Sequence, residues 1–168
     1  MHKGNGLTGR ERMVKTLRFE HPDRAPRQLW TLPGIEMFRG DELQTLLAQY
    51  PEDIASPVFS YGSSDRAQGT PNQVGTYTDA WGCVWEVGEP GVIGEVKAPP
   101  LADWANLAHY KPPYEILENA DFSRVNESCA QSDQFILTGT TVRPFERMQF
   151  LRGSENLFMD LAYGAAEV

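Results

Sequence analysis

Apolar positions near the start of the chain recur with helical spacing. Met13, Val14 and Leu17 share one face, and Thr8 followed by Glu11 has the spacing of a capping box, so a helix is predicted to begin there. The basic residues of this segment fall mostly on the other face, which we expect to be solvated: Arg10, Arg12, Lys15 and Arg18. His21-Pro22-Asp23 is predicted to end the helix.

A strand, a helix and a second strand are predicted next. Residues 26–32 become apolar toward their end and are closed by Pro33-Gly34, which favours a first strand. The following apolar stripe predicts a helix that Pro51 terminates, and it consists of Leu43, Leu46, Leu47 and Tyr50. Residues 53–60 predict a second strand, weakened by Pro57, which has no N–H to donate. This order predicts a parallel sheet with a right-handed crossover.

The second half of the chain combines loops, a hairpin and helices. Residues 61–75 are rich in Gly, Ser, Asp and Asn and predict a long loop, whereas residues 76–87 alternate and are turned back by 88–91, which predicts an inserted β-hairpin over about 76–97. A short helix is expected around Trp104 and Leu107, another over 122–130, and a third parallel strand over 135–139. Pro144 is predicted to start one helix. Ser154 is predicted to cap another, which buries Leu157, Phe158 and Leu161 and stops at Gly164.

Composition narrows the class of protein. The 168 residues are 40% hydrophobic, which predicts one globular domain over 1–168, and a net charge of -8 argues against nucleic acid as a partner. Residues 1–6 lead into no apolar signal region, and no apolar run is long enough to span a bilayer, so we expect a cytoplasmic protein without a membrane partner. Cys83 and Cys129 lack metal-ligand spacing with any histidine, so no metal is expected on this chain.

Four stretches resemble the uroporphyrinogen decarboxylase superfamily, and especially its cobalamin-dependent methyltransferase branch. The first runs from Thr8 to Arg12 and continues from Phe19 to Pro26. The second is Asp79 to Trp85, and the third is Gly94 to Lys97 together with Pro99 to Trp104. The fourth comprises Pro144 to Arg147, Leu151 to Gly153 and Glu155 to Leu157. Their common order makes the superfamily resemblance more specific than any one stretch.

The resemblance implies the N-terminal portion of a (β/α)8 barrel with its site at the carboxyl ends of the strands. It further implies methyl transfer involving a thiol or a methylated small molecule, with a small molecule or a corrinoid protein as substrate. Zinc and a corrinoid partner are implied for a full-length relative, with the metal ligands in the C-terminal half of such proteins. Open barrel edges would favour self-association, and the fragment alone is expected to be inactive.

Two alternatives remain at this stage. Uroporphyrinogen decarboxylation is disfavoured because the stretch after the first predicted strand has no Arg before Arg39, and Ser60 stands at the position of the family's catalytic Asp. The other alternative is a non-catalytic interaction module that keeps only this part of the fold.

Five residues are candidates for a site. Asp79 is flanked on its predicted strand face by Tyr77 and Trp81, which favours acid or base catalysis through desolvation, while a carboxylate that accepts backbone hydrogen bonds at a strand start is the simpler interpretation. Trp81 is a candidate for stacking on a flat ligand or a part of the hairpin core. The other candidates for substrate binding are Trp30 after the first predicted strand, Tyr61 after Ser60, and Arg143, whose alternative is a surface pair with Glu146.

Overall fold

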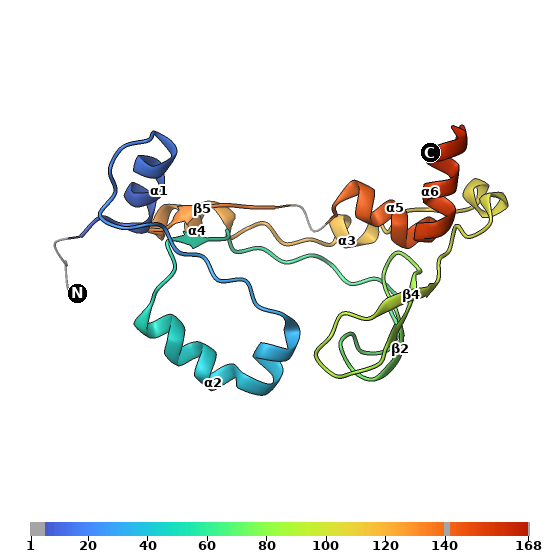
Figure 1. Cartoon of the computed structure of the whole chain (residues 1–168), viewed down its shortest axis with the longest axis horizontal. Coiled ribbons are helices and arrows are strands. Elements are labelled where there is room, and N and C mark those ends of the chain that lie inside the picture. Colours follow the sequence, from blue (N-terminus) through green and yellow to red (C-terminus); the bar gives the residue numbers. More distant parts are fainter. Residues whose placement is uncertain (1–5, 140–141, 168) are drawn as a thin grey trace. The chain divides into compact units, whose positions relative to one another are not determined.

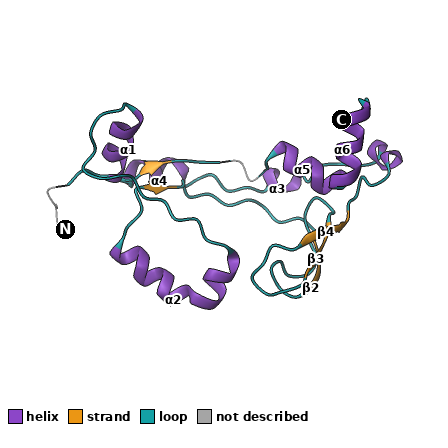
Figure 2. Ribbon diagram, in the orientation of Figure 1, coloured by secondary structure: helices purple, strands orange, loops and turns teal. Residues whose placement is uncertain are grey.

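The computed structural model describes residues 6–139 and 142–167, and it divides into two compact units (Figure 1). Unit 1 comprises residues 1–60 and 121–139, and unit 2 comprises residues 61–120 and 140–168. Residues 1–5, on which the signal-peptide argument partly rests, lie outside the described residues. Helices and strands occur in both units, so the fold is of mixed α/β type (Figure 2).

Helix α1 (Gly9–Leu17) begins at the predicted capping box. The Thr8 hydroxyl accepts a hydrogen bond from the Glu11 amide at 3.1 Å, and the Glu11 carboxylate accepts one from the Thr8 amide at 2.9 Å. The prediction that the basic face is solvated was wrong for Arg12, which is buried. Arg10 is exposed, as predicted, and also donates to the carbonyl oxygens of Cys129 and Ser132.

The first predicted strand, 26–32, does not form. The Leu29 amide donates to the Glu52 carboxylate and the Arg27 amide to the Asp53 carboxylate, so side chains take the place of ladder carbonyls. The backbone hydrogen bond between this segment and residues 52–53 runs from the Asp53 amide to the Arg27 carbonyl oxygen, at 2.9 Å. The segment therefore has no regular secondary structure.

Helix α2 (Pro33–Gln49) contains the predicted apolar stripe and starts earlier than that stripe. Pro33 occupies the first turn, where its missing N–H has no partner to lose. The backbone of Arg39 leaves helical geometry at φ -135° and ψ 29°, which kinks the helix. Leu43 is its buried residue, so most of the apolar side chains of α2 stay uncovered.

A parallel pair of strands forms in unit 1, as predicted, but it is short. β1 (Ile54–Ala55) pairs with β5 (Phe135–Ile136), with Ile54 opposite Phe135. Beyond Ala55 the ladder stops at Pro57, and the next amide, of Val58, donates to the Ser128 hydroxyl instead. Helix α4 (Val125–Gln131) precedes β5, close to the predicted 122–130. The described residues contain this small sheet and no closed barrel.

A charged cluster fastens α1 and the following turn to β1. Asp53 is 2% exposed, and its carboxylate accepts bonds from the guanidinium groups of Arg12 and Arg24 and from the Arg27 amide. Arg12 also donates to Asp23 at 2.6 Å and 2.8 Å. A buried ion pair of this kind is costly to break because one charge stays behind without a partner.

We expect unit 1 to lose stability in acid. The hydrogen bond from Arg12 holds the pKa of Asp23 far below its usual value. Burial opposes ionisation of Asp53, yet bonds from Arg24 and Arg27 and the charge of Arg12 keep its pKa lowered too. A lowered pKa contributes stability above the unfolded value of about 4, and that contribution is lost as pH falls through the folded values.

Circular dichroism and hydrogen exchange of α1 peptides, recorded from pH 6 downward, measure this loss. Asp53→Asn should remove part of the dependence below about pH 4. An α1 whose protection does not change between pH 6 and pH 2.5 would contradict the expectation.

Unit 2 contains a three-stranded antiparallel meander where a hairpin was predicted. Its strands are β2 (Gly75–Thr78), β3 (Val84–Val87) and β4 (Glu95–Ala98), in that order. The single long strand predicted over 76–87 was wrong, because residues 79–83 form a turn. Gly82 has φ +81° there, and the Asp79 carboxylate accepts the Trp81 and Cys83 amides.

The helices of unit 2 follow the meander in the sequence and are short (Figure 1). They are η1 (Trp104–Ala108), α3 (Glu115–Glu118), α5 (Pro144–Arg152) and α6 (Ser154–Tyr163). Pro144 starts α5 and Gly164, at φ 67° and ψ 44°, ends α6, both as predicted. Gly153 takes the N-cap position predicted for Ser154, which is instead the first helical residue.

The predicted core face of α6 is only partly correct. Leu157 is buried, whereas Phe158 and Leu161 are about half exposed. Among the described residues, no helix is long and apolar enough to cross a membrane.

Candidate functional site

The Asp79 carboxylate organises the turn between β2 and β3. One oxygen, Oδ1, accepts the amides of Trp81 at 3.0 Å and Cys83 at 2.9 Å. The other, Oδ2, accepts the indole N–H of Trp85 at 3.1 Å. The turn is therefore built around this carboxylate, in agreement with its position directly after β2.

Arg147 brings helix α5 to the same carboxylate. Its Nη1 lies 3.0 Å from Oδ2 of Asp79, and both side chains are less than a fifth exposed. The guanidinium carbon lies 4.8 Å from the centre of the Trp81 ring and 5.4 Å from that of Phe150. Stacking and charge thus hold Arg147 in place, and Asp79 has two donors on each of its oxygens.

Aromatic rings surround this ion pair. Tyr77 and Trp85 stack across β2 and β3 with centres 5.8 Å apart, and Trp85 and Phe150 form a T-shaped pair with ring centres 4.8 Å apart. Tyr110 donates its hydroxyl to the Trp81 carbonyl at 3.1 Å. The result is a polar pair enclosed by rings, with one face of Trp81 covered by Arg147.

Cys83 lies within this cluster and is fully buried. Its Sγ lies 3.4 Å from the Phe150 carbonyl oxygen, as donor to it. Burial, together with the nearby Asp79 charge, raises the pKa of the Cys83 thiol to about 12. At neutral pH the sulfur is a thiol and not a thiolate, so it is neither a nucleophile nor a metal ligand in this state.

The two cysteines should react at very different rates. We expect a thiol reagent to modify Cys129, which is partly exposed, and to reach Cys83 only after denaturation. The measurement is absorbance with a disulfide reagent at pH 8, with and without urea. Cys129→Ser should remove the fast phase, and a fast phase that survives this change would contradict the burial of Cys83.

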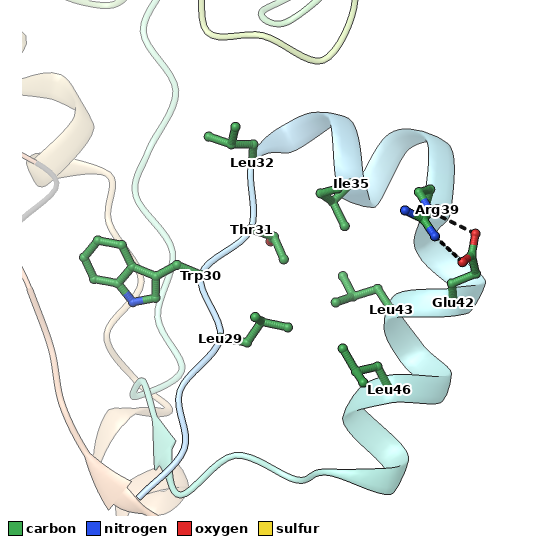
Figure 3. A pocket seen from close by; sticks show the side chains of 9 residues that line it. All are labelled: Leu29, Trp30, Thr31, Leu32, Ile35, Arg39, Glu42, Leu43 and Leu46. Carbon is green, nitrogen blue, oxygen red and sulfur yellow. Dashed lines mark hydrogen bonds and ion pairs between the residues drawn. The ribbon is translucent and has the colours of Figure 1, made fainter.

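Trp30 belongs to unit 1, where it borders a pocket between residues 29–32 and α2. The pocket has a volume of about 520 Å³. Figure 3 shows Leu29, Ile35, Leu43 and Leu46 between the two segments, whereas the indole of Trp30 points away from α2. Trp30 is 85% exposed, so its ring is available to a partner and does not form the pocket's floor.

The pocket is apolar with a charged rim. Arg39 and Glu42 lie at the kink of α2 and form an ion pair at 2.5 Å, well exposed to solvent (Figure 3). The volume of the pocket falls in the range of small-molecule sites, and the pocket's lining is of the kind that binds apolar groups.

Tyr61 and Arg143 lie in unit 2 outside the cluster described above. Tyr61 is at the start of a loop and 37% exposed. Arg143 pairs with Glu146 at 3.0 Å and its side chain is 75% exposed, which is the geometry of a surface ion pair.

The structure brings Asp79 and Trp81 together and adds residues that sequence reasoning missed. These are Arg147, Phe150 and Tyr110. Arg147 and Phe150 are three residues apart on α5 and so share a face, a spacing visible in the sequence. Nothing in the sequence indicated that this face meets the turn at Asp79, because the two are 68 residues apart.

The zinc implied by the family resemblance finds no ligand set in the part of the chain that the structure describes. No group of three or more His, Cys, Asp or Glu side chains is placed to hold a metal there. Cys83 is protonated and enclosed, which fits a structural thiol better than a ligand.

Comparison of the chain with protein-family models, with curated proteins and with solved structures found no match.

Proposed function

We propose that this chain is the N-terminal portion of a uroporphyrinogen decarboxylase-like protein, of the kind that transfers methyl groups with the help of a corrinoid. Its substrate is a small methylated molecule, a thiol or a corrinoid protein. The zinc and the corrinoid would be held by parts of the protein other than the residues described, so no chemical step is derived through them.

The observation that carries the proposal is that three of the four resembling stretches contact one another within unit 2. The second and fourth meet in the ion pair of Asp79 with Arg147. The third and fourth meet at Arg152, which donates to the carbonyls of Leu101 and Ala102 and lies 4.5 Å from the centre of the Trp104 ring. Residues of these three stretches thus contribute contacts that hold unit 2 together.

The first stretch has the same property in unit 1. Arg12, Asp23 and Arg24 all belong to it, and they form the charged cluster on Asp53. The parallel β1–β5 pair supports the same fold family, since it joins segments about 80 residues apart as a crossover connection would.

Within this proposal the candidate residues take different roles. Asp79 accepts four hydrogen bonds and is paired with Arg147, which favours a positioning role for this carboxylate over proton transfer. Trp30 and Arg143 are the more exposed candidates for contact with substrate. Trp81 offers a partly buried ring whose neighbour is already a guanidinium.

Porphyrinogen decarboxylation is the weaker candidate. Arg39, the first Arg after residues 30–35, is bound to Glu42 on α2. The backbone of Ser60, at the position of the family's catalytic Asp, bridges to Asp121. This reaction needs a guanidinium that binds the substrate's carboxylates and a catalytic acid. Arg39 and Ser60 do not supply these two groups.

The test is an assay of the protein isolated from its native host by antibodies against this chain. We expect transfer of the methyl group of methylcobalamin to a thiol, and no conversion of uroporphyrinogen to coproporphyrinogen. Immunodepleted extract is the control. Decarboxylation without methyl transfer would contradict the proposal, and loss of both activities would favour the interaction module.

The recombinant chain itself should contain far less than one zinc per molecule after gel filtration, because the described residues offer no ligand set. Elemental analysis decides this. One zinc per chain that disappears in Cys129→Ser would contradict the expectation.

A further inference from the structure

We draw no further inference here: the strongest candidate, the exposed apolar surface of helix α2 and the pocket between this helix and residues 29–32, is an unpartnered apolar face, and nothing in the structure shows what covers it.

Discussion

Asp53→Ala is expected to lower the free energy of unfolding of unit 1 by about 3–5 kcal/mol. The change removes the carboxylate that receives Arg12, Arg24 and the Arg27 amide, and it leaves the nearly buried Arg12 guanidinium with Asp23 as its one carboxylate partner and the Leu7 carbonyl as its other acceptor. Hydrogen exchange of peptides from α1 and β5 measures the effect locally.

The control for this change is Glu20→Ala in the same unit. Glu20 pairs with Lys15 at 3.4 Å, and both side chains are more than a third exposed, so about 0.5 kcal/mol or less is at stake. If the two substitutions were equally mild, the Asp53 cluster would not be what fastens α1 to the sheet.

Asp79→Ala is expected to destabilise unit 2 by about 2–4 kcal/mol, because four donors lose their acceptor in a site that water reaches only in part. Unfolding in urea, followed by tryptophan fluorescence, suits this unit since it contains Trp81, Trp85 and Trp104.

Two further substitutions separate the contributions. Asp79→Asn keeps an oxygen for the turn amides but loses the charge opposite Arg147, so it should cost less than the Ala variant. Glu95→Ala removes an exposed pair with Lys97 on β4 and should leave stability nearly unchanged. An Ala variant no weaker than Glu95→Ala would show that Asp79 does not organise the turn.

Local signals in the sequence predicted local structure well. The capping box of Thr8 and Glu11, the first-turn Pro144 and the left-handed Gly164 all occur as expected, because each depends on residues within one or two turns. Strands within 53–60 and 135–139 of a parallel sheet were also predicted, and two residues of each form the parallel pair, although their register was not predicted.

The errors arose where a side chain replaced a backbone partner. Alternation over 76–87 indicated one strand. The Asp79 carboxylate instead accepts hydrogen bonds from the amides of Trp81 and Cys83, and these bonds stabilise a turn. Residues 26–32 form no strand for the same reason, because their amides donate to the carboxylates of Glu52 and Asp53. Such bonds depend on tertiary neighbours that periodicity does not reveal.

The candidate site was predictable only in part. Asp79 and Trp81 were found because both lie in one stretch of sequence, whereas Arg147 and Tyr110 join them from segments far along the chain. The roles of these residues depend on which groups donate hydrogen bonds to the Asp79 carboxylate oxygens. These donors come together only in the folded unit.

Each unit is assembled from two separated pieces of the chain, and the pieces alternate: the second piece of unit 1 follows the first piece of unit 2. During synthesis β1 must wait for β5, and the turn at Asp79 must wait for Arg147, so neither unit is complete until most of the chain has left the ribosome. Closing such long loops slows folding, and it prolongs the exposure of unpaired strands. A cut between residues 79 and 120 would therefore divide unit 2 and separate both β1 from β5 and Asp79 from Arg147.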